Sequence, residues 1–66
     1  MEIKINGESR HFPVLLTVAE LVLELGYAGK RIAIERNGEI VPRSRHGDVA
    51  LAEGDCLEIV VAVGGG

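Results

Sequence analysis

Hydrophobic and polar residues alternate at the start of the chain, a pattern that predicts a half-buried strand over residues 1–5. Asn6 and Gly7 follow, and this pair favours a tight hairpin because both residue types tolerate a positive φ angle. Residues 8–12 return as a second strand, which Pro13 ends because proline cannot donate to a ladder. The chain therefore opens with a predicted antiparallel hairpin.

A single amphipathic helix is predicted next. Thr17 is a suitable N-cap, and Glu20, three residues later, completes a capping box. The apolar residues that follow recur at helical spacing and share one face: Val18, Leu21, Val22 and Leu25. Gly26 supplies the left-handed residue that commonly ends a helix. We expect about two and a half turns of helix with one buried face.

The hairpin pattern is repeated after the helix. Residues 31–36 alternate between apolar and polar, and Asn37 and Gly38 form a second turn signal. Residues 39–41 return as a short strand, and Pro42 ends it. This part of the chain predicts a second antiparallel hairpin.

The remaining residues complete an α+β pattern. Residues 43–50 are charged and irregular, residues 53–55 (Glu-Gly-Asp) predict a turn, and residues 56–63 predict the longest strand. The order ββαβββ indicates a mixed sheet with one helix across one face, in which the strands on either side of the helix run parallel. This is the β-grasp, or ubiquitin-like, arrangement. We expect one domain over residues 1–63 and a flexible glycine tail over residues 64–66.

Composition and charge narrow the classes of function. Seven basic and ten acidic side chains give a net charge of −3, and the aromatic residues are one Phe and one Tyr. A nucleic-acid-binding domain of this size commonly carries a basic stripe and stacking aromatics. No apolar run approaches the ~18 residues of a membrane span, and the N-terminus lacks the layout of a signal peptide. We expect a cytoplasmic protein that binds neither nucleic acid nor membranes.

Few residues offer catalytic chemistry. Cys56 follows Asp55, whereas a reactive thiolate is favoured by basic neighbours. His11 and His46 have no nucleophile beside them in sequence, and with Cys56 they form no paired metal-ligand spacing. The basic segment at residues 43–45 is expected to be a solvated loop. We therefore expect no catalytic residue, no metal site and no bound cofactor.

The terminal residues Gly64, Gly65 and Gly66 allow two interpretations. They are either a frayed end or a tail whose lack of side chains lets it enter a slot only wide enough for backbone. In the second case the carboxylate of Gly66 is the reacting group and must first be activated, for instance as a mixed anhydride with a nucleotide. Three extended residues reach about 10 Å, so the folded body must dock at the rim of a partner's active site.

One face of the predicted sheet offers a docking surface. The last strand is expected to face the helix with alternate residues, Leu57, Ile59, Val61 and Val63. Val60 and Ala62 then point outward, and the neighbouring strands are expected to add Ala33 and Val41 to the same face. A partly apolar outward face beside a tail is typical of a partner surface, although scattered aliphatic residues are common on protein surfaces.

Several segments together match the pattern of a known family. They are the stretch Ala33-Ile34-Glu35-Arg36-Asn37-Gly38-Glu39-Ile40-Val41-Pro42-Arg43-Ser44, the opening Ile-Asn-Gly hairpin, the helix start Thr17-Val18-Ala19-Glu20-Leu21, the turn Glu53-Gly54-Asp55 and the Val-Gly-Gly-Gly end. Within the first stretch, the block at residues 37–43 is fairly specific. With these segments the chain resembles, over essentially its whole length, the ThiS sulfur carriers of thiamin thiazole biosynthesis.

The resemblance implies a β-grasp protein on which other enzymes act. A ubiquitin-activating-type adenylating enzyme (ThiF-like) would adenylate the carboxylate of Gly66 with ATP, and a persulfide donor fed by a cysteine desulfurase would replace AMP with sulfur. The resulting thiocarboxylate would deliver sulfur to a thiazole synthase (ThiG-like). Gly65 and Gly66 match the family's ending, and Gly64 stands where relatives often have another small residue. The face with Val60 and Ala62 would be shared by successive partners.

Two other functions stay open. The small subunit of molybdopterin synthase has the same fold and a Gly-Gly end, but it is usually longer and is not expected to contain the block at residues 37–43. The second alternative is a β-grasp interaction module with no chemistry at its terminus. Such a module would keep its function without Gly66, whereas a carrier would lose it.

Overall fold

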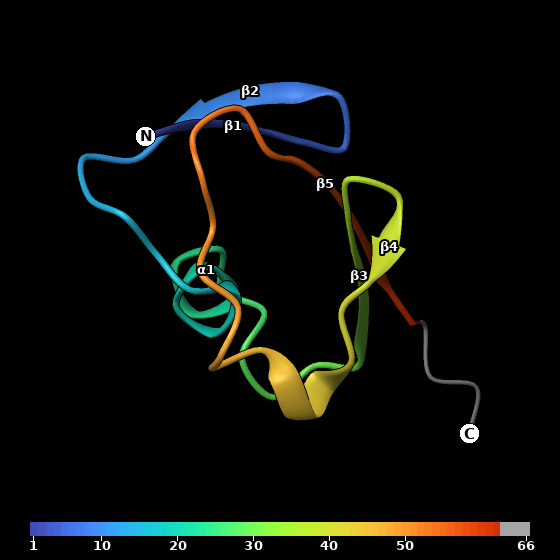
Figure 1. The fold of residues 1–66 in the computed structure, drawn as a ribbon. Coiled ribbons are helices and arrows are strands. Elements are labelled where there is room, and N and C mark those ends of the chain that lie inside the picture. The colour runs from blue at the N-terminus through green and yellow to red at the C-terminus, as the bar shows by residue number, and fades with distance from the viewer. Residues whose placement is uncertain (63–66) are drawn as a thin grey trace.

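The computed structural model describes residues 1–62, and residues 63–66 lie outside the described part. The described residues form a mixed five-stranded sheet with the strand order β2-β1-β5-β3-β4 and one α-helix across one face (Figure 1). This architecture confirms the predicted α+β class, the β-grasp arrangement and the order of strands and helix.

The elements lie within the predicted segments. The strands are β1 (Glu2–Ile5), β2 (Glu8–His11), β3 (Ile32–Arg36), β4 (Glu39–Ile40) and β5 (Cys56–Val61). The helix α1 spans Val18–Glu24, and a short 3-10 helix, η1, spans Arg43–Arg45 within the segment predicted to be irregular. The predicted last strand extends to Val63, which lies outside the described residues.

Both hairpins turn on an Asn-Gly pair, as predicted. The φ angles of Asn6 and Asn37 are both 51°, and those of Gly7 and Gly38 are 85° and 87°. Two consecutive positive φ angles define the turn type whose twist matches that of the flanking strands. A two-residue turn also sets the register, so the residues on either side of each turn are partners: Ile5 with Glu8, and Arg36 with Glu39.

Helix α1 begins with the predicted capping box. The N–H of Glu20 donates to Oγ1 of Thr17 at 3.2 Å, and the N–H of Thr17 donates to Oε1 of Glu20 at 2.8 Å. The N–H groups of Val18 and Ala19 donate to backbone carbonyls in the segment after η1, each at 2.9 Å. The free donors of the first turn are therefore satisfied, and that segment is held against the helix. Gly26 follows the helix with a φ of 78°, as the sequence predicts.

The core lies between the sheet and α1. It consists of buried aliphatic side chains from the sheet, from α1 and from the segments that connect them: Ile3, Ile5, Val18, Leu21, Ile34, Val41, Leu51, Leu57 and Ile59. The neighbouring strands β1 and β5 pair in parallel, whereas the other neighbouring strands pair antiparallel. The strands that flank the helix in sequence, β2 and β3, therefore run in the same direction, with β1 and β5 between them.

Candidate functional site

Strand β5 is the element that leads in sequence toward the terminal glycines. It lies in the middle of the sheet, between β1 and β3 (Figure 1). The predicted reacting residue, Gly66, and its neighbours Gly64 and Gly65 lie outside the described residues. The site that the structure describes is therefore the surface around β5 up to Ala62.

The outer face of the sheet, on the side away from α1, is partly apolar along β5. Ala33 lies directly opposite Val60 in the ladder of β3 and β5, and both are exposed, Val60 by 61%. Ala62 is also exposed, and its N–H donates to the carbonyl of Arg31 at 2.9 Å. The structure thus places Ala33, Val60 and Ala62 at the surface, and their role in docking stays a prediction.

Val41 does not lie on this face, and its predicted place there is wrong. Val41 is only 8% exposed and belongs to the core, whereas its neighbour Ile40 is 65% exposed and lies opposite Glu35. Adjacent residues of a strand point to opposite faces, so an error of one residue exchanges a surface residue for a core residue. The two-residue turn at residues 37–38 could have corrected the assignment, because it makes residue 40 the partner of residue 35.

We call the exposed aliphatic residues of this face the outer patch: Ala33, Ile40, Val60 and Ala62. Two carboxylates share the face with them. Glu35 lies directly opposite Glu58 in the ladder of β3 and β5, and both are exposed. Ile40, Glu35 and Glu58 therefore form a row across three neighbouring strands, beside the pair of Ala33 and Val60.

Two asparagines hold β5 from opposite sides. The side chain of Asn6 donates from Nδ2 to the carbonyl of Ile59 at 3.0 Å and accepts the N–H of Ile59 at 2.7 Å. On the other side, Oδ1 of Asn37 accepts the N–H of Cys56 at 2.9 Å. The residues that turn the hairpins therefore also fix the strand that leads to the tail, a role that sequence reasoning did not find.

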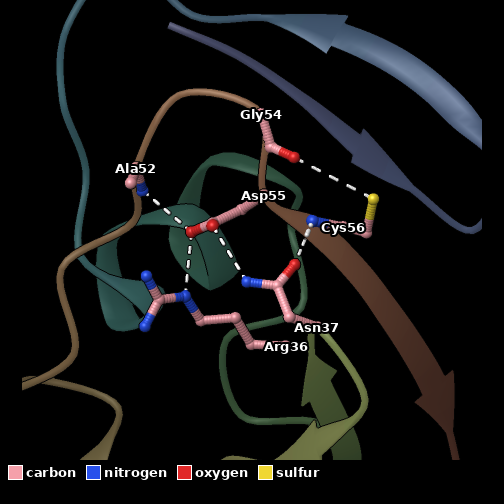
Figure 2. A network of polar contacts seen from close by, with 6 residues as sticks. All are labelled: Arg36, Asn37, Ala52, Gly54, Asp55 and Cys56. Atoms are coloured by element: carbon pink, nitrogen blue, oxygen red, sulfur yellow. Dashed lines mark hydrogen bonds and ion pairs between the residues drawn. The ribbon is translucent and has the colours of Figure 1, made fainter.

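Asp55 is a buried acid directly before β5 (Figure 2). Its Oδ2 accepts hydrogen bonds from Nε of Arg36 and from the N–H of Ala52, both at 2.8 Å, and its Oδ1 accepts one from Nδ2 of Asn37 at 3.1 Å. Burial by itself would raise the pKa of Asp55, but these hydrogen bonds and the charge of Arg36 outweigh burial and lower the pKa. The ionised carboxylate therefore anchors β5. The sequence assigns only a turn to this residue.

The cysteine and the histidines are not brought together. Cys56 is exposed, and its Sγ lies 3.9 Å from the carbonyl oxygen of Gly54 (Figure 2). His46 is half-buried with Nε2 3.2 Å from the carbonyl oxygen of Val41, whereas His11 is exposed on β2. Within the described part of the chain, no three His, Cys, Asp or Glu side chains are grouped so that they could hold a metal ion.

The basic segment Arg43–Arg45 forms η1 and is exposed. Nε of Arg45 lies 3.6 Å from Oδ2 of Asp48, and both side chains are largely in solvent. Such an exposed pair contributes little to stability. Among residues 1–62 there is also no helix with the length and apolar character needed to cross a membrane.

Comparison with protein families and individual proteins gives a consistent result. The model of the ThiS family matches residues 3–66. The chain is 50% identical over its full length to a thiazole synthase of Paramagnetospirillum magneticum and 39% identical to one of Magnetococcus marinus, but it spans only 20% of each of these proteins. It is 38% identical over 50 residues to the sulfur carrier protein ThiS of Bacillus subtilis, which is 76% of either chain.

Solved structures agree with this match. The crystal structure of a thiamine biosynthesis protein (ThiS) from Geobacter metallireducens superposes with a TM-score of 0.85 at 29% identity, and the match covers all of both chains. A solution structure of a thiamine biosynthesis protein from the same organism gives a TM-score of 0.82 and covers 88% of that chain.

Proposed function

The chain belongs to the ThiS family, and from this premise we propose that it is a sulfur carrier of thiamin biosynthesis whose reacting group is the carboxylate of Gly66. The observation that best supports the proposal is the outer patch, which lies on β5 and its neighbours just before the terminal glycines. A partner that binds this patch would need its active site within about 10 Å of the folded body, since three extended residues reach no farther.

The first step of the proposed reaction activates the carboxylate. An oxygen of the Gly66 carboxylate attacks the α-phosphate of ATP, pyrophosphate leaves, and an acyl adenylate forms. A ubiquitin-activating-type (ThiF-like) partner supplies the ATP site and the groups that stabilise the developing charge. The carrier contributes the tail, because glycines pass through a channel too narrow for side chains.

The second step replaces oxygen with sulfur. The terminal sulfur of a persulfide, formed with the help of a cysteine desulfurase, attacks the acyl carbon, and AMP leaves with the bonding electrons. This step gives an acyl disulfide that joins the carrier to the donor. A thiol then attacks the donor's sulfur in that disulfide, and the S–S bond breaks to release the thiocarboxylate of the carrier. The carrier thus holds one sulfur atom in a form that a thiazole synthase (ThiG-like) can take up.

The proposed partners divide the chemistry among themselves. A segment 50% identical to the whole of this chain occurs within a protein named thiazole synthase, which supports a thiazole synthase as the recipient of the sulfur. In this scheme the body of the carrier needs no catalytic side chain, and the carrier is a substrate of its partners.

Intact-mass measurement tests the proposal. The protein, ending in a free Gly66 carboxylate, is incubated with the adenylating enzyme, ATP, a persulfide donor and a thiol reductant. We expect a gain of about 16 Da that maps to the C-terminal peptide, since one sulfur replaces one oxygen. A sample without ATP serves as the control. Unchanged mass in the complete mixture would contradict the proposal.

A further inference from the structure

The basic residues are unevenly distributed in this acidic protein. Of its seven lysine and arginine residues, four lie in two short segments, residues 30–31 and residues 43–45, although the net charge of the chain is −3. All four are exposed. No ion pair among residues 1–62 includes Lys30 or Arg43, so neither has a carboxylate of that part of the chain within 4.0 Å. Their charges are therefore available to an anion from outside the protein.

The two basic segments meet at a small cavity between η1 and the loop that follows α1 (Figure 1). Its volume is about 40 Å³, and it is lined by residues of both segments and their neighbours: Val22, Tyr27, Gly29, Lys30, Ile32, Arg43 and His46. None of the described residues in this lining is acidic. Two larger cavities, of about 240 and 280 Å³, do include acids, Glu39 in one and Glu2 and Glu53 in the other. The small cavity is therefore the one suited to an anion.

The lining offers hydrogen-bond donors that the described chain leaves unused. The ammonium of Lys30 and the guanidinium of Arg43 can only donate. The N–H of Gly29 donates to no acceptor among residues 1–62, and a residue without a side chain lets a ligand approach the backbone closely. The ring of His46 is held in place by the hydrogen bond from Nε2 to the carbonyl of Val41 at 3.2 Å. Such a set of donors suits an oxyanion, which accepts several hydrogen bonds at once.

The cavity lies at the end of the sheet from which the tail continues. Ile32, in its lining, pairs with Val61 at the end of β5, and the carbonyl of Arg31 accepts the N–H of Ala62 at 2.9 Å. Four further residues span at most about 14 Å when extended. A compound that reacts with the carboxylate of Gly66 therefore comes within this distance of the end of β5.

We propose that this cavity binds a phosphoryl oxyanion. A water molecule needs roughly 10–15 Å³ of such volume, so the cavity of about 40 Å³ holds about three water-sized groups, as many as the free oxygens of a terminal phosphate. A carboxylate has only two oxygens and would leave donors of the lining unpaired. The choice of a phosphoryl group also rests on the proposed function, because loading of the tail uses ATP and releases pyrophosphate and AMP.

The test is a backbone-amide NMR titration of the full chain at constant ionic strength. The probes are inorganic phosphate, pyrophosphate and AMP, and acetate serves as the carboxylate probe. The variant Lys30→Gln with Arg43→Gln removes both cations of the lining, whereas the control variant Lys4→Gln with Arg10→Gln removes two exposed cations of β1 and β2. A third variant, Lys30→Arg with Arg43→Lys, keeps both charges. Urea denaturation shows that each variant is folded.

We expect saturable shifts of the Gly29, Lys30 and Ile32 amides with phosphate, and tighter binding of pyrophosphate because it carries more charge. Phosphate should bind at least about tenfold more weakly to the variant that lacks both cations. It should bind within about twofold of wild type to the control and within about threefold to the charge-keeping variant. AMP that binds at least as tightly as phosphate assigns the cavity to a nucleotide phosphate, and AMP that binds more weakly assigns it to a free ion.

Three results would overturn the proposal: no saturable shift of wild type with phosphate or pyrophosphate, acetate binding as tight as phosphate binding, or an equal loss in the control variant. Sulfur loading of the same samples, followed by intact mass, keeps the two proposals apart. If wild type gains sulfur but binds no phosphate, the cavity assignment is wrong and the carrier function stands. If wild type binds phosphate but gains no sulfur, the carrier function is wrong and the phosphoryl site stands.

Discussion

The side-chain amide of Asn6 pairs with the backbone of Ile59 through two hydrogen bonds, at 3.0 and 2.7 Å, across 53 residues of sequence. The backbone N–H of Asn6 donates to Leu57 at 2.9 Å, so the amide extends the parallel ladder of β1 and β5 by one further step. The same residue turns the first hairpin with a φ of 51°. One side chain therefore couples a local turn to the central pairing of the sheet.

Replacing Asn6 should destabilise the protein for two separable reasons. Asn6→Gly keeps the positive φ but loses both side-chain hydrogen bonds, and we expect a loss of about 1–2 kcal/mol in the free energy of unfolding. Asn6→Ala adds the strain of a left-handed alanine and should lose roughly 1 kcal/mol more. Urea denaturation measures both values, and faster hydrogen exchange at the Ile59 amide should accompany them. Equal stability of both variants and wild type would show that the amide does not support β5.

Asp55 should contribute to stability in a pH-dependent way. Folding lowers the pKa of the Asp55 carboxyl from its ordinary value of 3.8 in the unfolded chain. At a pH between the folded and the unfolded pKa, the carboxyl is therefore more often protonated in the unfolded chain than in the folded protein. The contribution is therefore fully present above the unfolded pKa and is lost as the pH falls through the lower folded pKa. Urea denaturation between pH 7 and about pH 2 should show that the free energy of unfolding decreases as the pH is lowered.

The variant Asp55→Asn provides the comparison. At pH 7 it should be less stable than wild type by about 2–4 kcal/mol, because Arg36 loses its buried partner. The difference from wild type should shrink as the pH falls below the unfolded pKa. Asp48→Asn, which changes an exposed pair, should stay within about 0.5 kcal/mol of wild type. If the difference in stability between Asp55→Asn and wild type is constant across the pH range, the ionised carboxylate of Asp55 is not the source of that difference.

Ile40 and Val41 are adjacent but should respond in opposite ways to truncation. Val41→Ala leaves a gap in the core and should destabilise the protein by about 2 kcal/mol. Ile40→Ala should change stability by less than about 0.5 kcal/mol, because its side chain is in solvent, but should weaken partner binding. Urea denaturation and titration against the adenylating enzyme separate the two effects. Normal binding by the Ile40 variant would remove that residue from the docking surface.

Deletion of Gly66 should abolish sulfur loading without affecting the fold. The deletion moves the terminal carboxylate back by one residue, about 3.5 Å, away from the position where it would be adenylated. A displacement of this size should slow loading by at least about a hundredfold, as followed by intact mass. The urea midpoint should equal that of wild type. Loading at the wild-type rate would show that the reaction does not need the carboxylate to stand at residue 66.

Most of the fold could be predicted because its signals are local. The Asn-Gly pairs predict both hairpins from two adjacent residues, and the capping box of Thr17 and Glu20 predicts the start of the helix from residues three positions apart. These contacts form within a single turn of chain, so neighbouring residues determine them. The outward orientation of Val60 follows in the same way from alternation along a long strand.

The candidate site was only partly predictable. Strand β4 has two residues, too few for alternation to show which of Ile40 and Val41 faces outward. The sequence places Asp55 in a turn, but its burial depends on Arg36 and Asn37, which a different hairpin brings to it. Nothing near Glu35 in the chain indicates that Glu58 lies opposite it.

By itself the sequence determines the order of elements, the turns, the helix boundaries and the terminal glycines of this ThiS-family protein, since these depend on residues close together in the chain. The tertiary structure alone decides that β1 and β5 lie side by side, that Asn6 and Asn37 hold β5 from both sides, and that the two glutamates meet on the outer face. These features join residues up to 53 positions apart. They arise only when the whole sheet packs against the helix and its register is set by burying one face of every strand.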